Sequence, residues 1–111
     1  MIEITIKKYL EKNLKVPIFL EVPEKMPSKF IVFEKTGSSR KNYLNSSTFA
    51  FQSYALNLYG AAKLNEELKE VVLKMLELPE MANIKLNSDY NFTDMDLKKY
   101  RYQAVFDIYH Y

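Results

Sequence analysis

Apolar and polar residues follow a strand-like pattern most clearly in the middle of the chain, where two aromatic-rich runs flank a polar segment. The runs are residues 30–35, FIVFEK, and residues 48–54, TFAFQSY. β-Branched and aromatic side chains fit the half-buried surface of a sheet, so the two runs are predicted to pair as a long β-hairpin. Neither face of the second run is cleanly polar, so we expect helices to cover one face and another subunit to cover part of the other.

The polar segment between these runs is predicted to be a loop, because glycine and serine favour turns. It is longer than the tight two-residue hairpin turn, so its tip is expected to project from the body of the protein as a mobile arm. We expect this arm to contact other chains rather than to carry out chemistry. The candidate contact residues are Thr36, Gly37, Ser38, Ser39, Arg40, Lys41 and Asn42.

Two amphipathic helices are predicted from apolar residues spaced three or four positions apart. The first covers residues 2–15 and ends before Pro17, because the residue before a proline is driven toward extended geometry. The second begins at the potential cap Asn57 and runs to about Leu78, ahead of Pro79. Its apolar stripe consists of Ala61, Leu64, Leu68, Val71, Val72 and Met75.

Three further strands are predicted from short apolar or alternating runs at residues 18–22, 84–92 and 100–111. The element order is therefore α-β-β-β-α-β-β over a single domain, residues 1–111. This order predicts an α+β fold with a mostly antiparallel sheet of about five strands and two helices packed on one face.

Charge and composition narrow the function without defining it. The net charge is only +2, and of the 16 basic residues only Arg40 and Arg101 are arginine, the residue that best recognises phosphate. Charge therefore gives nucleic-acid binding no support, although it does not exclude it. The chain has no cysteine, no apolar run of about 18 residues and no signal-peptide pattern at its start, so we expect no disulfide, no membrane span and cytoplasmic synthesis.

Few residues could support catalysis or metal binding. His110 is the only histidine, and without a cysteine or a second histidine it cannot form a nucleophilic dyad or a metal site. Asp89, Asp94 and Asp96 could supply oxygen ligands to a hard cation, but their spacing is not that of an EF-hand, and a solvated turn is the commoner explanation. Residues 36–41 hold one glycine and lead into a strand, unlike a P-loop. We predict no catalytic residue, cofactor or metal.

Aromatic residues on the strands raise one further possibility, a stacking platform for single-stranded RNA or DNA. The candidates are Phe49, Phe51, Tyr54, Tyr102 and Phe106. The same spacing is typical of a sheet core, which is the commoner outcome, and the Gly-Phe-Gly-Phe run of RNA-recognition motifs is absent. We therefore expect these side chains to form core.

The layout of the whole chain matches a known pattern better than any single site does. After an amphipathic helix, a strand ends in Lys35-Thr36-Gly37, an aromatic strand ends in Tyr54-Ala55, and a second helix follows. The residues that carry the match are Pro27, Phe30, Ile31, Val32, Thr36, Gly37, Phe49, Tyr54, Ala55, Ala61, Arg101, Tyr102 and Gln103. This layout resembles that of the tail terminator proteins, also called tail-completion or head–tail joining proteins, of long-tailed bacteriophages and prophages.

The resemblance implies a small α+β subunit that assembles into a hexameric ring, caps the growing tail tube and joins it to the head connector. The implied partners are the tail tube protein and a head-completion protein, and DNA passes through the channel without sequence recognition. The implied location is the virion, after assembly in the bacterial cytoplasm. A contact role for residues 36–42 is implied by position only, and this chain has Gly37-Ser38 where many relatives carry two glycines.

Two alternatives stay open. Within the same class, the protein could be another head–tail connector component, such as a stopper or a minor capsid protein. From a different class, its lysine and tyrosine residues could serve a small nucleic-acid-binding or regulatory module. Tight, salt-sensitive binding to short DNA or RNA would distinguish that module from a virion protein.

Overall fold

The computed structural model describes residues 1–111, and it confirms the predicted α+β class and element order. The elements, in chain order, are α1 (Ile2–Asn13), β1 (Ile18–Phe19), β2 (Phe30–Lys41), β3 (Leu44–Ala55), α2 (Leu58–Lys74), the 3₁₀ turn η1 (Met75–Glu77), β4 (Met81–Asn91) and β5 (Tyr100–His110). Neither helix is long and apolar enough to cross a lipid bilayer.

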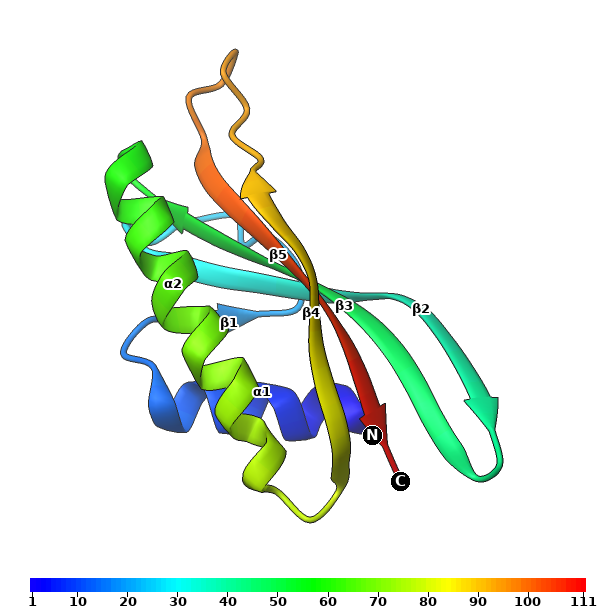
Figure 1. The fold of residues 1–111 in the computed structure, drawn as a ribbon. Helices are drawn as coiled ribbons and strands as arrows, with labels where there is room; N and C mark the ends of the chain where they lie inside the picture. The colour runs from blue at the N-terminus through cyan, green and yellow to red at the C-terminus, as the bar shows by residue number, and fades with distance from the viewer.

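The five strands form one sheet in the order β1-β2-β3-β5-β4. All neighbours run antiparallel except β1 and β2, which pair in parallel over only two positions, Ile18 with Ile31 and Phe19 with Val32. Helices α1 and α2 both pack on one face of this sheet, and the two termini lie at the same end of the molecule (Figure 1). Because β1 is so short, β2 and β4 hold the two margins of the sheet over most of its length.

The core lies between the helices and the face of the sheet that they cover. Strand alternation directs Phe33, Phe49, Phe51 and Phe106 to that face, and all four side chains are fully buried. The rings of Phe33 and Phe51 stack with centroids 5.5 Å apart, and Phe106 meets Phe51 edge to face at 5.8 Å. Burying one such side chain contributes about 1.5–3 kcal/mol, so this cluster determines which residues of the strands face inward.

A smaller apolar cluster lies on the face that the helices leave uncovered. It consists of Phe30, Val32 and Tyr54, with Phe19 packed against it. The rings of Phe30 and Tyr54 stack with centroids 4.5 Å apart. This cluster explains why neither face of the hairpin strands has a cleanly polar sequence.

Helix α2 begins at the predicted cap, because the Asn57 side chain accepts a hydrogen bond of 2.7 Å from the Gly60 N–H. Its buried stripe differs from the expected one at two positions. Asn65 is fully buried, whereas Val71 is only partly buried. The Asn65 amide donates a hydrogen bond of 3.3 Å to Asp89 of β4, a long-range partner that helical periodicity does not reveal.

Several element boundaries differ from those expected from the sequence. Helix α2 ends at Lys74 and is followed by η1, instead of running to about Leu78, and β3 begins at Leu44 instead of residue 48. Helix α1 ends at Asn13 instead of residue 15, and β1 covers two residues of the expected 18–22. Strand β4 begins at Met81 instead of residue 84, because Met81 pairs with His110 of β5 and is buried in the core. Apolar periodicity locates elements well but leaves their ends to long-range pairing.

The prediction of a long hairpin loop is wrong. Strand β2 continues to Lys41, and residues 37–41 pair with residues 44–48 of β3. Only Asn42 and Tyr43 lie between the strands, and both have positive φ, 53° and 66°, which is the sign pattern of a type I′ turn. Backbone groups pair whether side chains are polar or apolar, so a polar sequence did not prevent the ladder from extending. The tip is therefore a tight turn at the end of a strand ladder.

Candidate subunit-contact surfaces

The hairpin tip carries the most exposed large apolar side chain of the protein. Tyr43 exposes 85% of its surface. The Arg40 guanidinium lies 5.9 Å from the centre of the Tyr43 ring, within the range of a cation–π contact. The predicted contact residues 36–42 lie along β2 and in the turn, and all are exposed. Tyr43 lies just outside that predicted segment, and the sequence carries no clear signal for it, because a type I′ turn prefers glycine at this position.

The backbone of Tyr43 is strained. Its φ of 66° lies in the left-handed region, where bulky L residues are rare and type I′ turns prefer glycine. This conformation costs about 1 kcal/mol or more, and an exposed side chain recovers none of it by burial within the chain. A costly conformation that presents an exposed aromatic ring is typical of a residue kept for a contact.

The strand beside the tip has an open outer edge. Because β1 pairs only with Ile31 and Val32, residues 33–41 of β2 have no partner strand on that side. A register shift between Lys35 and Gly37 interrupts the ladder with β3. Irregularities and charged residues on an edge strand limit indiscriminate pairing with other chains. The edge is thus open, but its irregularity and its charged residues disfavour simple sheet extension.

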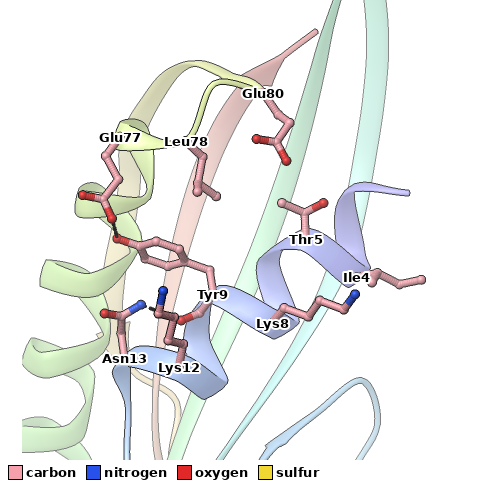
Figure 2. Close-up of a pocket in the computed structure, with 9 residues that line it drawn as sticks. All are labelled: Ile4, Thr5, Lys8, Tyr9, Lys12, Asn13, Glu77, Leu78 and Glu80. Atoms are coloured by element: carbon pink, nitrogen blue, oxygen red, sulfur yellow. Dashed lines mark hydrogen bonds between the residues drawn. The ribbon is translucent and has the colours of Figure 1, made fainter.

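A cavity of about 430 Å³ lies between α1 and the connection from η1 to β4 (Figure 2). Its lining consists of Ile4, Thr5, Lys8, Tyr9, Lys12, Asn13, Glu77, Leu78 and Glu80. The Tyr9 hydroxyl donates a hydrogen bond of 2.7 Å to Glu77 Oε1, and Asn13 Nδ2 donates one of 2.8 Å to the Tyr9 carbonyl. Tyr9 therefore joins α1 to η1 and forms a wall of this cavity, which we call the α1–η1 cavity.

Some of the charged groups that line the α1–η1 cavity have a partner within the chain, and others have none. Burial raises the pKa of Tyr9 to about 12, and the hydrogen bond to Glu77 and the charge of Glu77 act in the same direction. The phenol therefore stays protonated at neutral pH and cannot act as a general base. Glu80, Lys8 and Lys12 form no ion pair within the protein. Figure 2 shows Glu80 pointing toward α1 from the β4 side, Lys12 pointing toward Tyr9, and Lys8 running along α1 toward Ile4.

A second cavity, of about 250 Å³, lies at the other end of the β2–β3 hairpin, where Phe30 pairs with Tyr54. Most of its lining is apolar, including Leu97 from the β4–β5 connection. Its charged lining residues are Lys98 and Lys99, with no carboxylate among them. This second cavity is smaller than the α1–η1 cavity, whose lining holds both lysines and glutamates.

Arg101 organises the uncovered face of the sheet near this second cavity. Its Nη1 donates a hydrogen bond of 2.8 Å to the Tyr54 hydroxyl, and its Nε donates one of 2.7 Å to the Phe92 carbonyl. The guanidinium also lies 4.6 Å from the centre of the Phe92 ring. Arg101 therefore fastens the turn after β4 to β3, which is a structural explanation for its place on this strand.

The aspartates considered for a cation site are not brought together. Asp94 Oδ1 accepts hydrogen bonds of 3.1 and 3.3 Å from the backbone N–H groups of Asp96 and Leu97, which makes it a turn residue. Asp89 instead forms an ion pair of 3.2 Å with Lys69 of α2. No group of three or more His, Cys, Asp or Glu side chains is placed to hold a metal ion.

The lone histidine lies on the covered face at the end of β5. Its Nε2 is 3.1 Å from the Ser47 Oγ. Burial lowers the pKa of His110, so the imidazole is largely neutral at pH 7. Ser47 and His110 have the spacing of a serine–histidine pair, but the Ser47 hydroxyl is buried and no carboxylate hydrogen-bonds to the ring, so the bond serves the packing of β3 on β5.

The five aromatic residues weighed as a stacking platform do not form one. Phe49, Phe51 and Phe106 are fully buried beneath the helices. Tyr54 is buried on the opposite face, and Tyr102 is partly buried. The expectation that these side chains form core is confirmed for the three phenylalanines and for Tyr54.

Neither a scan against protein-family models nor a search of curated proteins finds a match for this chain. Function therefore has to follow from the surfaces themselves. The described groups offer a cationic aromatic tip, an open strand edge and a cavity with unpaired charges, which are features suited to recognition between macromolecules.

Proposed function

We propose that this protein is a structural virion assembly subunit of the tail terminator kind, which forms a homo-oligomeric ring at the end of a phage or prophage tail. The observation that carries the proposal is Tyr43, an exposed aromatic residue held in an unfavourable backbone conformation at the hairpin tip. Contact with a neighbouring subunit accounts for such a residue, because the free energy of the contact offsets the cost of its backbone conformation.

The arm that carries Tyr43 is pre-organised for contact. Strands β2 and β3 pair up to Lys41 and Leu44, directly before the turn, and β5 pairs with β3 as far as Asn45. A ladder that reaches the turn leaves little conformational entropy to be lost when the tip binds. This geometry supports a contact role better than a long loop would, because ordering a loop would weaken the association.

The resemblance in layout supplies the rest of the proposal. It implies six copies around a channel, with the tail tube protein on one side, a head-completion protein on the other, and DNA passing through without sequence recognition. The net charge of +2 is compatible with self-association, since a strong like charge on every copy would oppose it. A location in the virion belongs to this proposal as well.

Native mass spectrometry and sedimentation over a series of protein concentrations test the proposal, with and without the tail tube protein from the same genome. We expect a ring for the natural sequence and its loss for Tyr43→Ala, with thermal unfolding retained. Tyr59→Ala is the matched control, because Tyr59 is also highly exposed, at 77%, but lies at the start of α2. A strict monomer that never binds the tail tube would overturn the proposal.

Two further observations separate this proposal from its alternatives. Neighbouring genes for a tail tube protein and a head connector would support a head–tail role. Tight binding of the monomer to short DNA or RNA, weakened steeply by salt, would favour the nucleic-acid-binding module instead.

A further inference from the structure

Two adjoining hollows at one end of the sheet are lined by lysines and by no carboxylate. The first is the second cavity described above, with Lys98 and Lys99 as its charged lining residues. The other, of about 260 Å³, has Lys29 and Lys63 as its charged lining residues. The residues that line both hollows are Ser28, Ala55 and Leu56, so the two form one continuous surface, which we call the lysine groove.

The single sign of its charge distinguishes the lysine groove from the other cavities. The α1–η1 cavity is lined by two lysines and two glutamates. A cavity of about 410 Å³ beside β1 combines Lys7 with Glu11 and Glu21, and one of about 370 Å³ beside α2 combines Lys63 with Glu66. A hollow lined by one sign of charge attracts the opposite sign, so the lysine groove is the one suited to an anionic partner.

The positive charge of the lysine groove is not neutralised within the chain. None of its four lysines forms an ion pair. Helix α2 begins at the groove with no acidic residue in its first turn, so the partial positive charge of the helix start adds to that of the lysines. The acidic residues nearest to these lysines along the sequence do not line the groove; they are Glu24, Glu66, Glu67, Asp94 and Asp96. Glu66 is paired with Lys69 at 2.9 Å instead.

Large apolar side chains line the same groove and are exposed. Leu56 exposes 75% of its surface, Leu97 65% and Met26 45%. They border the stacked rings of Phe30 and Tyr54, which are buried. Apolar surface that gathers in the open, surrounded by charged residues, is typical of a site of interaction with another macromolecule.

The size and lining of the groove fit a protein segment better than a nucleic acid. Each hollow is below the roughly 300–1,000 Å³ of small-molecule pockets, but protein interfaces often anchor one apolar side chain in a small hollow. Nucleic acids are usually bound by arginine and by bases stacked on exposed rings. No arginine lines this groove, and Tyr59 is the only exposed aromatic residue among its lining residues.

We infer that the lysine groove binds an acidic segment of a different protein. One apolar side chain of that segment is anchored beside Leu56 and Leu97, and carboxylates on either side of it pair with the lysines. This site is independent of the self-association proposed above, because the hairpin tip lies at the opposite end of the β2–β3 ladder (Figure 1). The protein therefore has separate surfaces for a neighbouring subunit and for an acidic partner.

A titration of the full chain with short capped peptides, followed by NMR, tests the inference. The peptide Asp-Asp-Leu-Asp-Asp should bind saturably, with shift changes confined to the lysine groove. The peptides Asn-Asn-Leu-Asn-Asn and Asp-Asp-Ala-Asp-Asp should each bind at least about tenfold more weakly, because the first lacks the charges and the second lacks the apolar anchor.

Two variants of the protein complete the test. Lys98→Asn removes one charge, and asparagine adopts the φ of 51° at this position more readily than lysine, so thermal unfolding should be retained. Lys63→Glu reverses a charge on the exposed side of α2. Both variants should weaken binding of the acidic peptide, by about tenfold for Lys63→Glu. Lys41→Glu is the matched control, since it changes the net charge equally at the hairpin tip and should leave the affinity within about twofold.

The contrary outcomes are distinct. Equal binding of the asparagine peptide, or an equal loss of affinity in Lys41→Glu, would show unspecific attraction and overturn the inference. Salt-sensitive binding of short single-stranded DNA at the same lysines, without binding of the acidic peptide, would assign the groove to nucleic acid. Self-association weakened by Lys98→Asn, again without peptide binding, would assign it to a second copy. In each case the inference fails, whereas the proposed function is tested separately by Tyr43→Ala.

Discussion

The hydroxyl of Tyr9 donates a hydrogen bond of 2.7 Å to Oε1 of Glu77, although the two residues lie 68 positions apart in the chain. The bond joins α1 to the 3₁₀ turn after α2, and so it shapes the α1–η1 cavity. A buried donor that loses its acceptor costs about 1–3 kcal/mol, so the pair couples helix packing to the form of this cavity.

Replacing Tyr9 by phenylalanine should lower the free energy of unfolding at pH 7 by about 1–2 kcal/mol, because the change removes a hydrogen bond to a charged acceptor. Urea denaturation measures the loss. Glu77→Gln is the control, since the amide keeps an acceptor at this position and should cost less. A Tyr9→Phe variant as stable as the natural sequence would contradict a role for this bond in joining the helices.

The same tyrosine should limit stability at high pH. Its pKa is raised from 10.0 in an unfolded chain to about 12 in the folded protein. The unfolded chain therefore loses this proton first, so the stabilisation is fully present below about pH 10 and declines as the pH rises toward 12. Denaturation at several pH values above neutrality should show a steeper alkaline decline for the natural sequence than for Tyr9→Phe. Parallel curves would refute the assignment.

His110 should affect the stability of the fold at acidic pH. Burial is the largest effect and lowers the pKa of His110 below the unfolded value of 6.5. The hydrogen bond with the Tyr111 backbone opposes it, the charge of Lys35 lowers the pKa further, and Glu3 raises it slightly. As the pH falls, the unfolded chain takes up a proton first, so the stabilisation is present above pH 6.5 and is lost below it. His110→Gln should flatten this acidic decline in thermal melting, and an unaltered pH profile would count against burial of the neutral ring.

The sequence predicts those elements in which the apolar residues recur with a regular period and are also the residues that become buried. The alternation of Phe49 and Phe51 placed β3 correctly, and the spacing of Leu64 and Leu68 placed α2. The Asn57 cap indicated where α2 begins, whereas Pro17 and Pro79 lie several residues beyond the ends of α1 and α2. These features are local, so a single sequence contains them.

The candidate contact surfaces could not be predicted in the same way. The outer half of β2 is polar and exposed, and it is a strand because β3 pairs with its backbone. The α1–η1 cavity depends on Tyr9 and Glu77, whose pairing across 68 positions has no local pattern. The loop geometry expected for residues 36–42 is therefore wrong, Tyr43 lies outside that segment, and the contact role of the segment stays a prediction. The resemblance to tail terminators stays a prediction.

Tyr43→Gly should separate stability from assembly. Glycine adopts positive φ without strain, so the variant removes the conformational cost at a φ of 66°. The larger conformational entropy of glycine in the unfolded chain offsets part of this gain. The net effect should stabilise the monomer by about 0.5–1 kcal/mol, roughly 2–4 °C in Tm. The same change removes the exposed ring, so self-association should be lost. Tyr43→Ala is the control: it also removes the ring but keeps a Cβ at positive φ, so it should abolish assembly without the gain in Tm. Calorimetry and sedimentation on the two variants measure both effects, and a Tyr43→Gly protein that still assembles would show that the strained tyrosine is not retained for the subunit contact.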